Sequence, residues 1–345
     1  MAHTICTFNV NNLFVRYRFG RKFPGDRSAA SMIEDPDWGY LPSYDPDLMT
    51  LFNPEQRELA ARAMTADRTA FPDLVCLQEV ESLLALRRFN EEHLQGQYRH
   101  ALLVDSRDFR QIDVGILSNL EILDVRTHVD DHDPTPDDPT DPWLFSRDCL
   151  ELEVVLSGNR RLSLFVNHLK SKYAETPAER VRADALRKRQ AERVRDILRE
   201  RFSGNRYQSA WFAVVGDLND EALSDPMKPL SEDAGLVNVL DRIPDDRERW
   251  THWYRSENDV SQLDYIYVSP ALDTATDGVV PRIERRGVSF SRILQDGGIG
   301  PRETELHRID GDQNPTRIDF RFPRFPEVTP RSYASDHCAV FFEVP

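Results

Sequence analysis

A carboxylate and a carboxamide, Asp217 and Asn219, follow the apolar residues 211–215 and Gly216. The valines of that run predict a buried strand. The two polar groups would then project from the end of the strand, where rigid scaffolds commonly place chemistry. Gly, Asp and Asn also form ordinary turns for backbone reasons, and this stretch taken alone favours a turn. The other polar groups of the chain shift the balance towards a catalytic site.

Five further strand-like segments carry polar side chains at one end, namely Asn9 with Asn11, Glu79, Asn167 with His168, Asp264, and Asp336 with His337. A carboxylate that ends an apolar strand is costly to bury without a partner. Strands that lie side by side in sheets would bring these ends together, and six coincidences of this kind are hard to explain as strand caps. Carboxylates and amides with two histidines and no cysteine suit a hard cation, so we expect Mg²⁺ or Mn²⁺ as the cofactor.

The elements that position these groups follow from hydrophobic patterning. Strands are predicted at residues 4–8, 73–80, 112–118, 150–156, 162–166, 211–215, 265–268 and 338–344. Helices are predicted at residues 54–70, which Asn53 precedes as a cap, and at residues 82–94, which Ser82 caps.

A third helix is predicted after Thr176, where Pro177 and Glu179 complete a capping box. Its apolar stripe is expected to consist of Val181, Ala185, Val194, Leu198 and Phe202. We expect the many Arg and Glu side chains of this helix to form a solvated face.

The composition restricts the class of protein. The chain has 345 residues, of which 40% are hydrophobic, and a net charge of −15. This acidity argues against a module that only holds nucleic acid, which would carry a basic face, but not against an enzyme that gathers carboxylates around a cation. No apolar run reaches the roughly 18 residues of a membrane span. We expect no signal peptide, because strand-like residues begin at position 4. The four dispersed cysteines predict buried, reduced thiols, with two disulfides as the arithmetical alternative, so we expect a cytoplasmic protein. Nothing in the sequence indicates an obligate protein partner.

Three long irregular segments, at about 15–53, 128–146 and 281–333, are expected as insertions in a single domain that spans residues 1–345. The first is locally basic and is either a functional lid or, the reading we favour, a solvated loop. The second has six aspartates and four prolines at residues 130–142 and is expected to be exposed. It lacks the Gly and the distal Glu of a calcium loop.

With these residues in place, the chain resembles the endonuclease/exonuclease/phosphatase superfamily, which has the deoxyribonuclease I fold. The resemblance spans the whole chain and rests on residues 7–11, 77–80, 166–168, 215–219, 263–266 and 335–337. It implies an α/β (α+β) fold in the form of a four-layer sandwich, with two mixed β-sheets packed face to face and helices outside. It also implies hydrolysis of a phosphoester.

The resemblance assigns roles by position. Glu79 resembles the principal metal ligand, with Asn11 and Asp336 near the same cation. Asn11 stands where many members have Asp, so the ion would be held with one charge fewer. Asp217 resembles the group that orients or deprotonates the attacking water, and Asn219 holds that water or the transition state. The remaining roles are phosphate contacts by His337, which is bonded to Asp264, and by Asn9 and His168.

Three further residues, Asn167, Lys170 and Arg110, are candidates for substrate binding, although Lys170 is equally compatible with a solvent lysine. The stretch at residues 167–172, Asn-His-Leu-Lys-Ser-Lys, resembles bacterial nucleases of the superfamily. The leading hypothesis is therefore a metal-dependent nuclease with nucleic acid as substrate. The alternatives are a phosphatase or phosphodiesterase acting on a small or lipid phosphoester, and a catalytically inactive scaffold, for which only Asn11 offers support.

Overall fold

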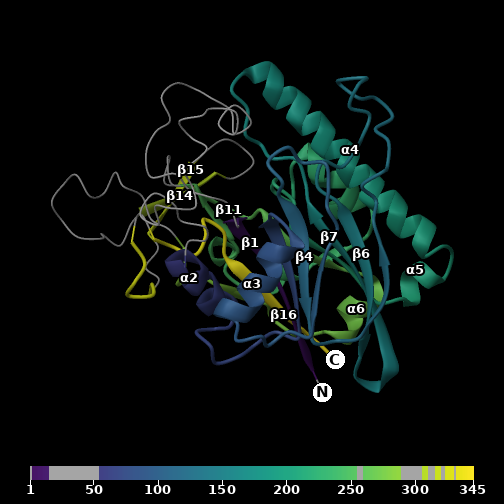
Figure 1. The fold of residues 1–345 in the computed structure, drawn as a ribbon. Helices are drawn as coiled ribbons and strands as arrows, with labels where there is room; N and C mark the ends of the chain where they lie inside the picture. Colours follow the sequence, from purple (N-terminus) through teal and green to yellow (C-terminus); the bar gives the residue numbers. More distant parts are fainter. Residues whose placement is uncertain are drawn as a thin grey trace, which may run out of the picture.

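The computed structural model describes residues 2–14, 54–254, 259–288, 305–309, 315–319, 323–329 and 332–345. The expected insertion at 15–53 lies outside the described residues, as does much of the one at 281–333. Two six-stranded mixed sheets dominate the described part of the chain (Figure 1).

The first sheet has the order β13-β16-β1-β2-β4-β3. Its strands are β13 (Arg282–Glu284), β16 (Ala339–Val344), β1 (His3–Leu13), β2 (Leu74–Val80), β4 (Asp113–Ser118) and β3 (His100–Leu103). The second sheet has the order β5-β6-β7-β8-β12-β9. Its strands are β5 (Ile122–Arg126), β6 (Cys149–Leu156), β7 (Arg160–His168), β8 (Phe212–Asp217), β12 (Asp264–Val268) and β9 (Val237–Asn238).

Alternation along the strands divides the apolar side chains between three cores. Leu74 and Cys76 of β2 share a core with Val166 of β7, so the two sheets pack face to face. The outer face of the first sheet packs against α2 (Pro54–Met64) and α3 (Leu83–His93), and the outer face of the second packs against α4 (Pro177–Arg201). The predicted four-layer sandwich is confirmed.

Strand direction brings the polar ends to one edge of this sandwich. β1 and β2 are parallel, as are β7 and β8, and contacts of Asn9 with Asp217 and of Glu79 with His168 place all four ends at the same edge. β12 runs antiparallel to β8, and β16 runs antiparallel to β1, so both begin there. In register, His168 and Asp264 both lie opposite Asp217.

A smaller sheet stands beside this edge, with the order β10-β11-β14-β15. Its strands are β10 (His252–Tyr254), β11 (Asp259–Ser261), β14 (Glu305–Ile309) and β15 (Pro315–Asp319). A β-bridge between His252 and His337 joins it to the segment before β16. Strands β14 and β15 fall within the segment expected as an insertion from 281. The start of that segment was placed too early, because β13 pairs with β16 in the first sheet.

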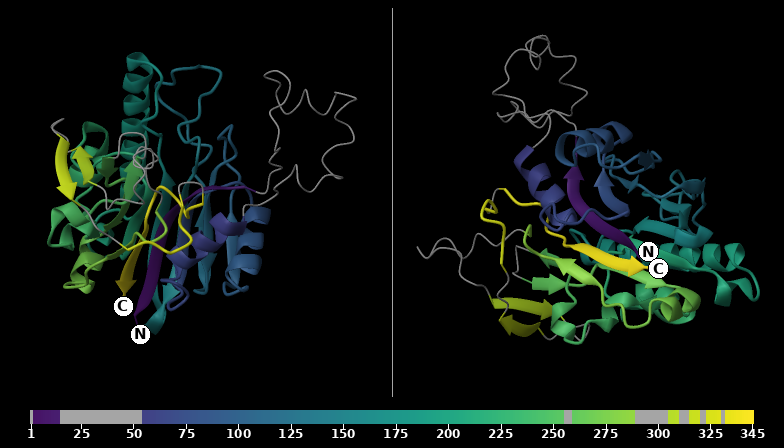
Figure 2. Two further views of the ribbon diagram at one scale, coloured as in Figure 1. Left: turned by 90° about the vertical axis from the view of Figure 1, so that its left-hand side faces the viewer. Right: turned by 90° about the horizontal axis from the view of Figure 1, so that it is seen from below.

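The remaining segments of the described chain are short. They comprise the helices α5 (Arg206–Ser209) and α6 (Pro270–Ala275), and the single turns Ser157–Asn159, Asp225–Met227, Pro229–Asp233, Val239–Arg242 and Asp246–Glu248. The two ends of the chain lie side by side, with His3 paired to Val344 (Figure 2).

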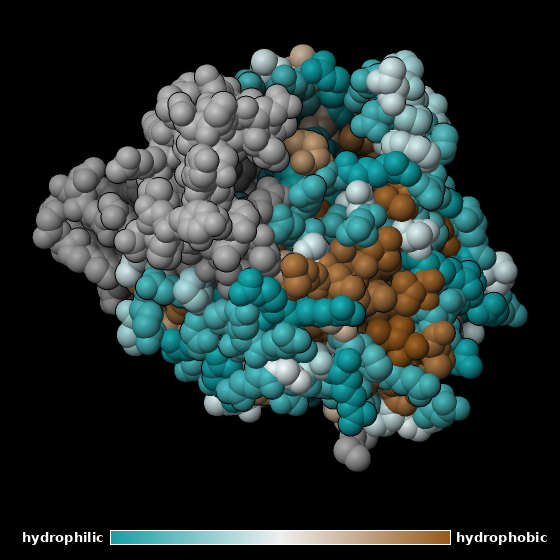
Figure 3. All heavy atoms as spheres, viewed as in Figure 1, coloured by the Kyte–Doolittle hydropathy of each residue, from teal (hydrophilic) through white to brown (hydrophobic). Residues whose placement is uncertain are grey.

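The strands at one open side of the sandwich, β3 and β5, carry half-buried apolar side chains such as Leu102, Ile122 and Val125. Figure 3 shows a hydrophobic area on this face, surrounded by hydrophilic residues. The described helices contain no segment long and apolar enough to cross a membrane.

Several local predictions are confirmed. Ser82 caps α3 by accepting a hydrogen bond from the Ala85 amide, and Thr176 and Glu179 form the expected capping box of α4. All four cysteines are buried and free.

Other local predictions are wrong. Helix α2 ends at Met64 rather than near residue 70. In α4, Val181 is 68% exposed and Ala185 is also exposed, whereas Arg187 and Gln190 are buried. The stripe that faces the sheet is therefore rotated and includes a charged side chain. The aspartate-rich loop is not wholly solvated either, because Asp133 is buried in a salt bridge with Arg189 of α4.

Candidate active site

The centre of the site is Asp217, the last residue of β8, which is only 1% exposed. One of its oxygens accepts a hydrogen bond from Asn9 Nδ2 at 3.0 Å, and the other accepts the Asn219 amide at 2.9 Å. Gly216 makes this arrangement possible. Its φ is +129°, and a Cβ at this position would stand 2.0 Å from the Asn167 carbonyl oxygen. The glycine is therefore required by the close approach of β7 as well as by its backbone conformation.

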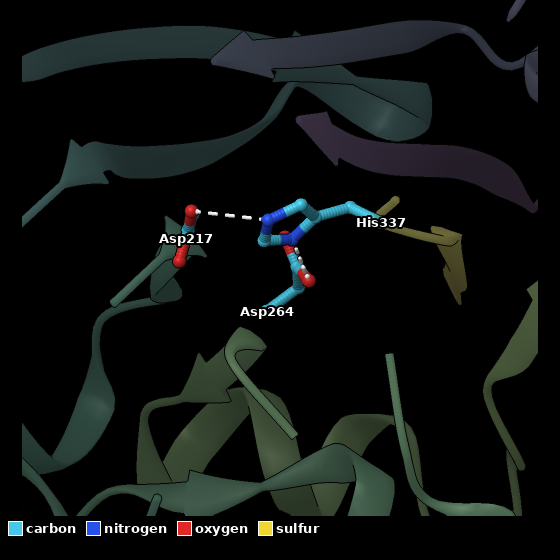
Figure 4. A group of neighbouring side chains, drawn as sticks. All are labelled: Asp217, Asp264 and His337. Carbon is cyan, nitrogen blue, oxygen red and sulfur yellow. Dashed lines mark hydrogen bonds and ion pairs between the residues drawn. The ribbon is translucent and has the colours of Figure 1, made fainter. Parts of the chain in front are cut away.

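A histidine–aspartate pair faces this carboxylate (Figure 4). His337 Nδ1 hydrogen-bonds Asp264 Oδ2 at 2.8 Å, and its Nε2 lies 3.7 Å from Asp217 Oδ2. Burial lowers the pKa of His337, but the negative charges of Asp264 and Asp217 outweigh it and hold the pKa well above its ordinary value. Burial raises the pKa of Asp217 to about 7, against the opposing effect of His337.

A second histidine, His168 at the end of β7, approaches the same oxygen of Asp217. Its Nε2 is 3.5 Å from Asp217 Oδ2 and 4.0 Å from Glu79 Oε1. Burial lowers the pKa of His168 well below its ordinary value, and the positive charges of Arg147, His337 and Arg110 act in the same direction. His168 is therefore neutral at pH 7, whereas His337 is positively charged.

The backbone around these side chains is unusual. Glu79, Asn11, Asn12 and Asn219 all have positive φ, with values of 66°, 48°, 62° and 57°. Such left-handed conformations are costly for residues other than glycine and gather at functional sites. They also interrupt the regular pairing of β1 with β2, whose register shifts after Asn9.

A cation fits the donors of this region. Glu79 Oε2 accepts the Asn12 amide at 3.0 Å, which fixes the carboxylate of a side chain that is 15% exposed. Asp336 is half-buried next to His337. Atoms of Asp217, Asp264 and His337 also lie within 4.8 Å of one another, in an arrangement that a metal ion can use. In that trio, however, the His337–Asp264 hydrogen bond already occupies one nitrogen and one oxygen.

The three expected substrate-binding residues lie in different places. Lys170 is half-buried in the loop after His168, and burial lowers its pKa. Arg110 is 42% exposed on a neighbouring loop and lies 3.8 Å from Asp108. Asn167 lies on the opposite face of β7 from His168 and donates to the Phe165 carbonyl, so a substrate contact by its side chain does not fit this structure.

The prediction of the site from sequence did not include the buried side chains that hold its loops in place. Two residues of α4 bond the backbone of Lys170. Arg187 NH1 donates to its carbonyl, and Gln190 Oε1 accepts its backbone amide. Arg147 NH1 and Asn219 Nδ2 both donate to the Leu169 carbonyl at 3.0 Å. A sequence signal did exist for the α4 pair, because Arg187 and Gln190 fall on the helical spacing of the buried Ala183 and Val194.

A model described as the endonuclease/exonuclease/phosphatase family matches residues 6–337. The chain belongs to this family. Enzymes of the family hydrolyse phosphoester bonds with divalent metals, which agrees with the carboxylates and histidines of this site. By family it is therefore a phosphoester hydrolase.

Solved structures also resemble the chain. TDP2 from D. rerio in complex with a single-strand DNA product is 17% identical, with a TM-score of 0.52 over 100% of this chain and 99% of that one. SmcL is 13% identical, with a TM-score of 0.56 over 100% and 99%. The human nocturnin catalytic domain with bound sulfate is also 13% identical, with a TM-score of 0.54 over 100% and 94%. At these identities the likeness shows the fold alone. No curated protein matches by sequence.

Proposed function

We propose that this family member is a Mg²⁺- or Mn²⁺-dependent nuclease that cleaves DNA or RNA by in-line attack of water on a phosphodiester. The proposal rests on one observation above all. Asp217 is buried, is oriented by hydrogen bonds from Asn9 and Asn219, and faces a histidine that Asp264 holds in place. Phosphodiester hydrolysis needs such a base opposite a fixed cation.

Each side chain has a step in this mechanism. Asp217, with a pKa near neutrality, takes the proton of the attacking water, and Asn219 positions that water. The positively charged His337 donates to a non-bridging phosphate oxygen and offsets the charge that develops there. The neutral His168 and Asn9 contact further phosphate oxygens.

Glu79 is the proposed principal ligand of the cation, with Asn11 and Asp336 as further oxygen donors. When bound, the cation supplies Lewis-acid polarisation of the phosphate. Glu79 suits this role because an amide of β1 holds one of its oxygens and its left-handed backbone turns it out of the regular strand pattern. Asn11 Oδ1 accepts a hydrogen bond from its neighbour Asn12, so a weaker contribution is expected from it.

Support for a nucleic-acid substrate comes from two basic residues near His168, Arg110 and Lys170, and from the DNA product bound to the similar D. rerio TDP2. The net charge of −15 favours the second candidate, a phosphodiesterase or phosphatase acting on a small or lipid phosphoester.

One activity panel separates the two candidates. Single-stranded DNA, plasmid DNA and RNA are compared with a set of small phosphomonoesters and diesters, each with Mg²⁺, with Mn²⁺ and with EDTA. We expect cleavage of nucleic acid that requires the metal. Hydrolysis of small or lipid esters without cleavage of any nucleic acid would replace the first candidate by the second.

A further inference from the structure

Phe109 is the most exposed large hydrophobic side chain among the described residues, at 92%. Its neighbours in the loop between β3 and β4 are polar, with Asp108 before it and Arg110 after it. A single aromatic ring among polar groups does not form the contiguous apolar patch of a membrane or protein contact. The exposed ring is large enough, however, to stack on a smaller, planar ligand.

The loop presents the ring rigidly. The buried Asp108 carboxylate accepts the Arg110 amide at 2.9 Å and Arg147 Nε at 2.9 Å. The Asp108 carbonyl accepts the Gln111 amide at 2.8 Å, which closes a tight turn with Phe109 at its tip. The ring thus stands on an anchored turn, so little ordering is needed when a ligand binds.

The anchor of this turn reaches the catalytic residues. Arg147 donates through Nε to Asp108 and through NH1 to the Leu169 carbonyl, the same oxygen that accepts Asn219 Nδ2. Leu169 directly follows His168. Arg110 Nε lies 3.8 Å from Asp108 Oδ1, so the guanidinium next to Phe109 is close to the same network.

We propose that Phe109 stacks on an unpaired nucleobase next to the scissile phosphate, with Arg110 close to the adjoining backbone. This inference rests on the proposed nuclease function and narrows its substrate to single-stranded nucleic acid. A base in a duplex has both faces covered by its neighbours, whereas an unpaired base offers a face to an aromatic ring at about 1–3 kcal/mol per base. The cation at Arg110 adds the backbone attraction that such sites combine with stacking.

The test measures binding rather than cleavage. Fluorescence anisotropy follows a labelled ten-residue oligothymidylate, and a ten-unit abasic strand with the same phosphates, in a D217N background. We expect Phe109→Ala to weaken binding of oligothymidylate by about 5-fold to 150-fold, which is the stacking energy expressed as an affinity ratio. Binding of the abasic strand is expected to change by less than twofold, and Phe109→Trp is expected to restore binding of the strand with bases.

Leu84→Ala is the matched control, because Leu84 is a 61% exposed apolar residue on α3. It is expected to leave both affinities unchanged. Equal weakening of both strands by Phe109→Ala, or no weakening of either, would overturn the stacking role. So would loss of binding to phosphatidylglycerol vesicles in Phe109→Ala with unchanged oligothymidylate binding, which would assign the ring to a lipid surface. Base-dependent binding in a protein that cleaves no nucleic acid would contradict the proposed function and leave the stacking role in place.

Discussion

Arg187 is the side chain whose removal should damage the scaffold of the site most. Its guanidinium is 0% exposed and lies 2.7 Å from Asp220 Oδ2, whose side chain is 4% exposed. It also donates to the Lys170 carbonyl at 2.8 Å. One buried charge thus joins the loop that carries Asp217 and Asn219 to the loop that follows His168.

The cost of Arg187→Met follows from the carboxylate it leaves behind. Breaking a buried ion pair by removing one partner costs about 3–5 kcal/mol. Lys172 Nζ stays 2.6 Å from Asp220 and is 41% exposed, so partial compensation places the expected loss at about 3 kcal/mol. Urea unfolding followed by tryptophan fluorescence measures it. The double variant Arg187→Met with Asp220→Asn removes both charges and is expected to be more stable than Arg187→Met by about 1 kcal/mol or more.

The pH dependence of this stability has a defined sign. Burial raises the pKa of Asp220, but Arg187 and Lys172 outweigh it and the pKa lies below its ordinary value. The pair therefore stabilises the fold above the pKa of an unfolded Asp, and this contribution is lost as the pH falls through the folded pKa. In Arg187→Met, this decrease in the free energy of unfolding at acid pH is expected to disappear.

Lys188→Met is the matched control on the same helix. Lys188 pairs with Asp225 at 2.7 Å on the surface, where the two side chains are 40% and 63% exposed, so little change in stability is expected. A loss below 1 kcal/mol for Arg187→Met, or strict additivity with Asp220→Asn, would refute the bridging role of Arg187.

Three further outcomes are expected. In urea unfolding, Gly216→Ala should lower the free energy of unfolding by about 3 kcal/mol, because its Cβ would meet the Asn167 carbonyl. Gly235→Ala, with φ +64° and open space around it, should lower it by about 1 kcal/mol. Similar losses for the two variants would contradict the steric argument. Burial raises the pKa of Asp113 to about 6, so wild type should lose about 2 kcal/mol relative to Asp113→Asn between pH 4 and pH 7, and parallel stability profiles would contradict this. EDTA should abolish cleavage and excess Mg²⁺ should restore it. Cleavage that persists in EDTA would contradict the role of the cation.

The layers of the fold, and the edge of the sandwich that carries the site, could be predicted from local sequence patterns. Residues 211–215 and 265–268 are short apolar runs that hold one side chain every second residue against the inter-sheet core, so their predicted extents nearly match β8 and β12. The capping box at Thr176 was legible for the same reason, because all of its atoms lie within four residues.

The parts that the sequence did not predict depend on distant partners. Arg187 was expected in solvent, since an arginine in an Arg- and Glu-rich helix is normally exposed. Its burial is set by Asp220, 33 positions later, and by the loop at Lys170. The stripe of α4 was misplaced for this reason, because the polar Arg187 and Gln190 occupy its buried face.

Asn167 was misplaced for a simpler reason. Consecutive residues of a strand face opposite sides, so Asn167 and His168 could not both point into the site while β7 stays regular. The left-handed residues Asn11, Asn12 and Glu79 had no such rule to reveal them, because their conformation depends on the register shift between β1 and β2.

The role of Asp217 as the base that prepares water is tested most directly by single-turnover cleavage of a fluorescent single strand with saturating Mg²⁺. Wild type and Asp217→Asn are compared at matched, saturating enzyme, with circular dichroism to establish that both are folded. We predict a loss of about 10²–10⁴-fold in the cleavage rate of Asp217→Asn with little change in strand binding. A folded Asp217→Asn variant that cleaves within tenfold of wild type would contradict the assignment.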